Sequence, residues 1–192
     1  MQYDLADRIS QGQNLIGNGY AIQQGDVIMI NEPAAVFRQL THGVYVIGVS
    51  DGSCINAFTA AWVMQVSFDP LLVALSIHQD HSSYDILKSG GVFTVNVLPA
   101  ERTDLAEHFG RAGKTEKLRD IKWHAAKTGA PILVEAMTWL DCRFSHECVT
   151  GDHILVIGQV LDGAMVDPDA SPMNYRCTGD MDGSSRLFPV KF

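Results

Sequence analysis

The sequence predicts a mainly β protein, an antiparallel barrel or sandwich with short peripheral helices. Apolar, β-branched runs of strand length follow one another between turn signals, and they do not alternate with long helical patterns. The chain has 192 residues, of which 46% are hydrophobic and 19% charged. This composition suits one domain with a sizeable core and excludes disorder as the main state. No GxGxxG or GxxxxGK[ST] nucleotide loop is present.

The predicted elements follow in chain order. Residues 1–32 are expected to form an irregular arm with one strand at Val27–Asn31, and a short helix is expected at Ala34–Leu40, directly after Pro33. The Asp51-Gly52 pair predicts a tight hairpin between two strands. The predicted strands after the arm are residues 44–49, 54–59, 62–67, 71–77, 92–98, 137–148 and 153–166.

Two further helices are expected on the outside of the sheet. Ser82 and Asp85 have the spacing of a capping box, and Gly90-Gly91 suits a helix end, which predicts a helix over 82–88. Residues 101–120 are polar, with helical spacing of Leu105, His108 and Phe109.

Charge and cysteine content narrow the functional class. The net charge of −8 argues against nucleic-acid binding, which needs clustered Lys and Arg. No apolar run approaches the roughly 18 residues of a membrane span, and the first residues lack the pattern of a secretory signal. The four cysteines form no CxxC pair, so a reduced, cytoplasmic protein without a metal site is expected.

Three segments are candidates for chemistry, and each has a plain structural alternative. In Asn56–Trp62, the small residues Ala57, Ala60 and Ala61 would let a flat ligand approach the backbone, but they also suit close strand packing. Ser82-Ser83-Tyr84 opens a predicted helix, where backbone N–H groups can bind an anion or Ser82 can simply cap.

A phosphate at that helix would need cations from elsewhere. Arg111, Lys114 and Lys117 could supply them, or they could form a solvated face. In Gly151-Asp152-His153, the imidazole could contact a ligand at a cleft rim or be structural. His78 and His81 lack the partners of a known metal site.

Five blocks in order resemble the flavin reductase-like, FMN-binding split-barrel family. Together they extend over about residues 35–165. The blocks are residues 37–49, 56–70, 93–98, 128–133 and 151–153.

The resemblance implies a six-stranded antiparallel Greek-key split barrel that forms a homodimer. It implies binding of FMN, with FAD as an alternative, and reduction of that flavin by NAD(P)H, with a monooxygenase or other electron acceptor as partner. It also implies the site residues. His153 would be catalytic, and the flavin would be held by Asn56, Thr59, Ala60, Ala61, Trp62, Ser82, Ser83, Tyr84, Phe109, Gly110, Arg111 and Lys117.

Some positions depart from the family pattern. Ala61 stands where Ser is usual and Ala57 where Gly is common, and the family's closing strand is expected at Asn174–Arg176. The expected division is an arm over 1–32, the barrel over 33–166 and a tail over 167–192 that packs on the barrel or on the dimer partner.

Two other functions stay open at this stage. One is a flavin electron carrier that does not react with NAD(P)H. The other is a sensor for haem or another planar ligand, with His78, His81 or His153 as axial ligand.

Overall fold

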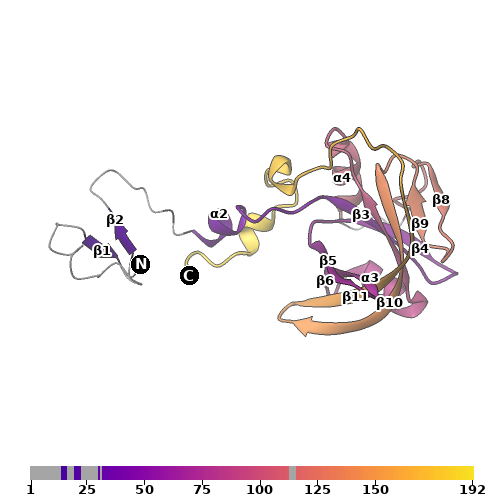
Figure 1. Ribbon diagram of the computed structural model, residues 1–192, viewed down its shortest axis with the longest axis horizontal. Coiled ribbons are helices and arrows are strands. Elements are labelled where there is room, and N and C mark those ends of the chain that lie inside the picture. The colour runs from indigo at the N-terminus through magenta and orange to yellow at the C-terminus, as the bar shows by residue number, and fades with distance from the viewer. Residues whose placement is uncertain (1–13, 17–19, 23–29, 31, 113–115) are drawn as a thin grey trace.

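The computed structural model describes residues 14–16, 20–22, 30, 32–112 and 116–192. Its main feature is one seven-stranded antiparallel sheet that curls into a barrel (Figure 1). In sheet order the strands are β4 (Ile55–Ala60), β3 (Tyr45–Ser50), β7 (Val92–Val97), β10 (Thr138–Thr150), β11 (His153–Met165), β6 (Leu71–His78) and β5 (Val63–Phe68).

Short elements surround this sheet. Helices α3 (Ser82–Gly90) and α4 (Thr103–Gly110) pack against it. The remaining elements are α2 (Pro33–Phe37), the strand pairs β1 (Asn14–Ile16) with β2 (Tyr20–Ile22) and β8 (Trp123–Ala125) with β9 (Pro131–Leu133), and the 3-10 helices η1 (Tyr175–Thr178) and η2 (Ser184–Leu187).

The predicted fold class is confirmed, with a sheet of seven strands instead of six. The chain bends at Ala61 and Trp62, so β4 and β5 become separate strands at opposite edges of the sheet. The Asp51-Gly52 hairpin is present: the Asp51 carboxylate accepts hydrogen bonds from the N–H groups of Ser53 and Cys54.

Two local predictions need correction, and a third falls largely outside the described residues. The N-cap of α3 is His81 and not Ser82, because the His81 ring accepts the hydrogen bond from the Ser83 N–H. Asn174–Arg176 contains a single bridge residue followed by η1, and not a closing strand. The strand predicted over 27–31 lies outside the described residues, apart from Ile30, which belongs to no strand.

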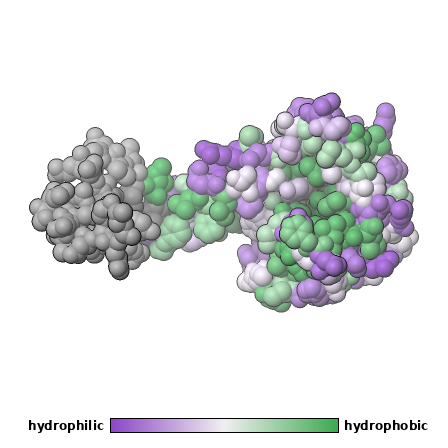
Figure 2. All heavy atoms as spheres, in the orientation of Figure 1, coloured by the Kyte–Doolittle hydropathy of each residue, from purple (hydrophilic) through white to green (hydrophobic). Residues whose placement is uncertain are grey.

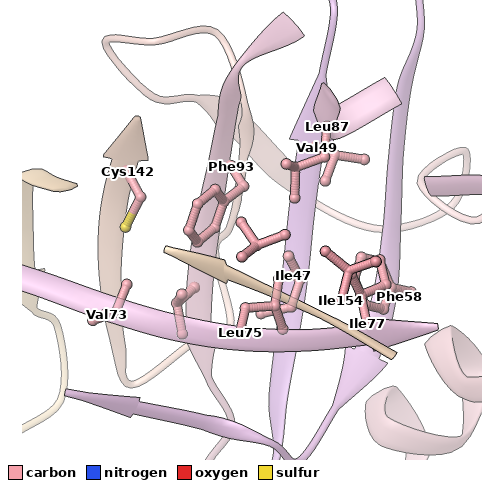
Figure 3. Packing of buried hydrophobic residues seen from close by; sticks show 12 residues of the cluster. Ile47, Val49, Phe58, Val73, Leu75, Ile77, Leu87, Phe93, Cys142 and Ile154 are labelled. Carbon is pink, nitrogen blue, oxygen red and sulfur yellow. The ribbon is translucent and has the colours of Figure 1, made fainter. Parts of the chain in front are cut away.

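The barrel interior is filled by side chains from both halves of the sheet. Ile47, Phe58 and Phe93 come from β3, β4 and β7, and they meet Leu75 of β6 and Val156 of β11 (Figure 3). Gly158 of β11 is required here, because a Cβ at that position would overlap the Phe93 ring. The interior is therefore packed solid, and ligand sites have to lie on the outside of the barrel.

A second apolar cluster lies on the outer face of β3 and β4. Leu105, Ala106 and Phe109 of α4 pack there against Val46 and other buried residues. Met173 of the C-terminal segment joins the same cluster. This cluster fixes α4 against β4, which places two of the predicted site segments side by side.

The C-terminal segment docks on the barrel, and its last residues then lie against the region of α2. The N–H of Met173 donates to the Leu98 carbonyl, and the Met173 carbonyl accepts from the Val44 N–H. Farther along, Asp180 lies 3.7 Å from Arg38, and the Phe188 ring lies 5.5 Å from that of Phe37 (Figure 1). The domain boundaries at 32/33 and 166/167 stay a prediction.

Replacing Met173 by Ala tests how firmly the C-terminal segment is anchored. The side chain is 1% exposed, so its truncation should lower the free energy of unfolding by about 2 to 5 kcal/mol. The control Leu187→Ala, at a side chain that is 84% exposed, should stay within about 0.5 kcal/mol of the parent. Denaturant unfolding measures both, and equal values for the two variants would show that the segment is not anchored through Met173.

Candidate functional site

A pocket of about 400 Å³, here called pocket 1, lies where β4 ends. One wall is the end of β4 with Ala61, the second is the C-terminal end of α4, and the third is the C-terminal segment around η1. The lining residues are Val44, Thr59, Ala60, Ala61, Ala106, Glu107, Gly110, Arg111, Ala112, Tyr175, Thr178, Met181 and Asp182.

Small residues dominate the β4 and α4 walls of pocket 1. Ala60 and Ala61 face Ala106 and Gly110, so little side chain stands between the space and the backbone. The Thr59 hydroxyl donates to the Ala106 carbonyl at 2.7 Å and holds the two walls together. A pocket of this volume with flat, small-residue walls fits a planar ring system, which can lie against backbone groups.

The charged lining of pocket 1 is mixed in sign. Arg111 pairs with Glu107 at 2.8 Å, and both side chains are more than half exposed. Asp182 accepts a hydrogen bond from the Tyr175 hydroxyl at 2.9 Å. The Arg111 guanidinium is the cationic group that the described lining offers to an anionic part of a ligand.

An aromatic cluster lies beside the bend between β4 and β5. The Trp62 ring lies 5.0 Å from the His153 ring, which in turn meets the His78 ring at 5.3 Å, edge to face. His153 begins β11 and His78 ends β6, and the two residues are register partners. The sheet thereby brings together three residues that are far apart in sequence.

Asp152 fixes the orientation of the His153 ring. Its carboxylate lies 2.8 Å from Nδ1 of His153, and this hydrogen bond is the main cause that lowers the pKa of Asp152 below its ordinary value. When Nδ1 donates its hydrogen to the carboxylate, Nε2 is left to accept a hydrogen bond from a ligand.

The predicted residues at the start of α3 do not line pocket 1. Asn56 donates to the hydroxyl of Ser83, which is fully buried, so this pair joins β4 to α3. Ser82 is exposed. The Tyr84 hydroxyl donates to Glu147 at 3.0 Å, and Lys88 pairs with the same carboxylate.

Phe109 and Lys117 lie behind the α4 wall. The Phe109 ring is fully buried, and its carbonyl accepts a hydrogen bond from the Lys117 ammonium at 2.7 Å. The Lys117 side chain is itself 6% exposed. Both residues support the end of α4, where Gly110 and Arg111 line pocket 1.

His81 lies near Lys117 and His78, and burial together with both of these charges lowers the pKa of its ring. Its ring lies 4.5 Å from the Phe58 ring and caps α3 through the Ser83 N–H. Burial is the first cause that lowers the pKa of His81, and the nearby charges of Lys117 and His78 add to the effect. The neutral ring is the form that can accept the capping hydrogen bond.

The C-terminal wall of pocket 1 was missed by the sequence analysis. Tyr175, Thr178, Met181 and Asp182 form this wall, and no pattern in the tail places them there. The one available signal was the Asn174-Tyr175-Arg176 segment, which was expected to close the sheet. Their position depends on the docking of Met173.

The described residues give little support for a cysteine-based site or a metal site. Cys54, Cys148 and Cys177 are exposed free thiols, while burial raises the pKa of Cys142 to about 12. The described residues contain no group of three or more His, Cys, Asp or Glu side chains that could hold a metal ion. No helix among them is long and apolar enough to cross a membrane.

The curled antiparallel barrel is the split-barrel fold of solved flavin reductases. The sequence model described as "Flavin reductase like domain" matches residues 37–182, and the chain belongs to this family. The predicted family resemblance is therefore confirmed.

Individual relatives agree with this assignment. The NADH:FAD oxidoreductase SgcE6 of Streptomyces globisporus is 25% identical, with a TM-score of 0.71 over 78% of this chain and 93% of that one. Nitrilotriacetate monooxygenase component B of Mycobacterium thermoresistibile is 26% identical, with a TM-score of 0.69 over 74% and 80% of the two chains.

A curated relative is much longer than this chain. Diflavin flavoprotein A 1 of Synechocystis sp. is 27% identical over 184 residues, which are 93% of this chain and 32% of that protein. The chain thus spans about a third of the length of this relative.

Replacement of His81 by Asn tests the capping role of the neutral imidazole. Because the pKa of His81 is lowered in the folded protein, the unfolded chain binds the proton more readily. The stabilisation is complete above the ordinary histidine value and is lost as the pH falls through the lowered value.

Between about pH 7.5 and pH 5.5, the free energy of unfolding should therefore fall more steeply in the parent than in His81→Asn, since Asn caps without titrating. Denaturant unfolding at several pH values measures both slopes. Equal slopes would remove His81 as a source of the pH dependence.

Proposed function

We propose that this protein is a flavin reductase that transfers a hydride from NADH or NADPH to FMN or FAD bound in pocket 1. The observation that carries the proposal is the wall formed by Thr59, Ala60 and Ala61 at the end of β4 against Gly110 and Arg111 at the end of α4. The family match and a relative named as an NADH:FAD oxidoreductase support it.

The residues of pocket 1 fit a flavin. The flat surface at Ala60 and Ala61 is open to the isoalloxazine ring, with backbone groups available for its polar edge. Arg111 would hold the anionic phosphate, and the Asn56–Ser83 and Lys117–Phe109 hydrogen bonds would keep both walls in place. Ser82 and Tyr84 would contact the phosphate of the flavin only if the flavin extends to α3.

When bound, the flavin supplies the two-electron acceptor, and the protein supplies orientation and electrostatics. We assign His153 to the binding and orientation of the hydride donor, NADH or NADPH. With Nδ1 held by Asp152, Nε2 can accept a hydrogen bond from the nicotinamide amide, and the Trp62 ring limits the movement of the imidazole. This arrangement orients the donor and requires no nucleophile or carboxylate pair.

The assay that tests the function is NADH and NADPH oxidation by the pure protein, with and without added FMN or FAD. We expect oxidation that rises and saturates with flavin. His153→Ala, which removes the accepting nitrogen, should reduce the rate by about 100-fold with flavin affinity retained, the loss that a small misplacement of the reacting groups can cause. Asp120→Asn, outside both the pocket 1 lining and the aromatic cluster, should behave as the parent.

Three outcomes would contradict parts of the proposal. Tight flavin binding with no oxidation of either nucleotide would favour a flavin electron carrier. A Soret absorbance without flavin binding would favour a haem protein. Unchanged turnover in His153→Ala would remove His153 from the mechanism.

We also propose that the protein forms a homodimer through β5. This edge strand exposes a row of apolar side chains: Met64 is 59% exposed, Val66 42% and Phe68 89%. Figure 2 shows apolar surface over the part of the barrel where β5 and β6 lie. An unpaired edge strand with this composition is typical of a protein–protein contact.

Replacing Phe68 by Asp should convert the dimer to a monomer, because a carboxylate would be buried in the contact. Sedimentation equilibrium measures the molar mass. Leu187→Asp, which makes the same change at an exposed position of η2, should leave the dimer intact. A monomeric parent, or a dimeric Phe68→Asp, would exclude β5 as the contact.

Two further points belong to the proposal. Reduced flavin would be passed to a partner monooxygenase, since one relative is component B of such an enzyme. The exposed free thiols of Cys54, Cys148 and Cys177 suit a reducing, cytoplasmic location.

A further inference from the structure

A second pocket, here called pocket 2, lies next to pocket 1 and has a volume of about 320 Å³. Its walls are largely aromatic, with Phe37 of α2, Trp62, Tyr175 and Phe188 among the lining residues. Phe188 and the lining residues Ser184 and Ser185 come after residue 182, where the family match ends. Pocket 2 is therefore partly a feature of this chain's own C-terminal segment.

The two pockets share a wall. Tyr175 lines both of them, and Trp62 lines pocket 2 while its neighbour Ala61 lines pocket 1. The Trp62 ring also contacts the His153 ring. A ligand with two joined parts could thus extend from the region of His153 into pocket 2.

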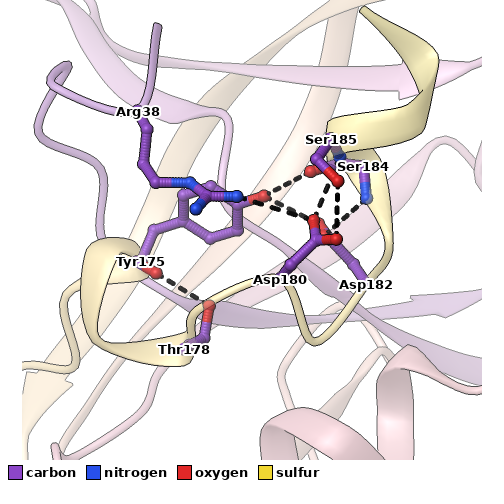
Figure 4. A network of polar contacts seen from close by, with 7 residues as sticks. All are labelled: Arg38, Tyr175, Thr178, Asp180, Asp182, Ser184 and Ser185. Atoms are coloured by element: carbon purple, nitrogen blue, oxygen red, sulfur yellow. Dashed lines mark hydrogen bonds and ion pairs between the residues drawn. The ribbon is translucent and has the colours of Figure 1, made fainter. Parts of the chain in front are cut away.

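The polar lining of pocket 2 includes Arg38, Ser184 and Ser185, and a network of side chains joins these residues to Asp180 and Asp182, which lie just outside the lining (Figure 4). Asp180 lies 3.7 Å from Arg38 and accepts hydrogen bonds from the N–H and the hydroxyl of Ser185, at 3.0 and 2.6 Å. Asp182 accepts from the Tyr175 hydroxyl at 2.9 Å and from the Ser184 N–H at 3.0 Å.

Charges in this network balance. The hydrogen bonds from Ser185 are the first cause that lowers the pKa of Asp180, and the charges of Arg38 and Arg186 lower it further, so Asp180 is ionised at neutral pH. The cations Arg38 and Arg186 therefore both act on Asp180. An incoming phosphate would meet an Arg38 that already has a carboxylate partner.

On the basis of the proposed function, we propose that pocket 2 binds the adenosine half of the hydride donor and that the Arg38–Asp180 pair selects NADH over NADPH. Aromatic walls suit the adenine ring. A carboxylate and a serine hydroxyl suit the 2′- and 3′-hydroxyls of the ribose, whereas a 2′-phosphate needs an available arginine. Asp180 disfavours the phosphate in two ways, by partly neutralising Arg38 through their ion pair and by repelling the added negative charge.

The test uses two ligands that cannot donate a hydride, ADP-ribose and 2′-phospho-ADP-ribose. Calorimetric titration of the full chain measures both dissociation constants without any redox reaction. The parent should bind ADP-ribose about tenfold or more tightly than the phosphorylated ligand, a difference typical of one unfavourable charged contact.

Variants of the pair should move this ratio in opposite directions. Asp180→Asn frees Arg38 and should shift the ratio by about tenfold or more in favour of 2′-phospho-ADP-ribose. Arg38→Gln leaves the carboxylate without its cation and should keep or strengthen the preference for ADP-ribose. The double variant should lose the gain seen in Asp180→Asn.

A charge-matched control separates local from general effects. Asp120→Asn changes the net charge by the same amount at an exposed residue that, unlike Asp180, forms no ion pair with Arg38, and it should keep the parent ratio. If Asp180→Asn unfolds, the Arg38→Gln result still decides, because a weakened preference for ADP-ribose in that variant contradicts the proposal.

Several results would overturn the inference. These are equal affinities in the parent, a preference for the phosphorylated ligand, an unchanged ratio in Asp180→Asn, or no binding of either ligand at millimolar concentration. If neither ligand binds while flavin-dependent NADH oxidation proceeds, pocket 2 is excluded and the proposed function stands. If ADP-ribose binds with the expected preference but neither NADH nor NADPH is oxidised, the pocket 2 assignment stands and the proposed function is excluded.

Discussion

The hydrogen bonding of the long β10–β11 hairpin to both halves of the sheet is the constraint on which the rest of the structure depends. β10 pairs with β7 and β11 pairs with β6, so the hairpin joins β4, β3 and β7 to β6 and β5. Register shifts between Asp141 and Cys142 and between Phe144 and His146 increase the local twist. The twist lets the sheet curl until both halves share one core around Phe93.

This closure also determines where chemistry can take place. The interior is filled, so both pockets lie outside the barrel, against the edge where β4 ends and the chain turns into β5. Helix α4 completes pocket 1, helix α2 completes pocket 2, and the C-terminal segment lines both. The apolar cluster that includes Met173 fixes α4 and the C-terminal segment. The barrel thus acts as a rigid support for walls supplied by less regular parts of the chain.

The strands of the main sheet were predictable because apolar, β-branched runs between turn residues are a local signal. The three-residue strands β8 and β9 were not, since such short segments carry no period. At α3 the prediction chose Ser82 as the cap, but burial of Ser83 against Asn56 leaves the preceding His81 ring in the capping position.

The candidate site was predictable in part. Thr59, Ala60, Ala61, Gly110 and Arg111 followed from the family resemblance, and the fold brings them to one pocket. The C-terminal wall could not be foreseen, because its residues meet the barrel only after the segment around Met173 has paired with Leu98 and Val44. Long-range docking of this kind leaves no pattern in a single sequence.

The position of Tyr175 between the two pockets has a thermodynamic consequence. Its ring forms part of both walls, and its hydroxyl is held by Asp182 and Ser184 on the same short segment. A ligand that shifts this ring in one pocket changes the free energy of binding in the other. By linkage such an effect would be reciprocal: a ligand that shifts the ring in either pocket would alter the affinity of the other pocket by the same factor.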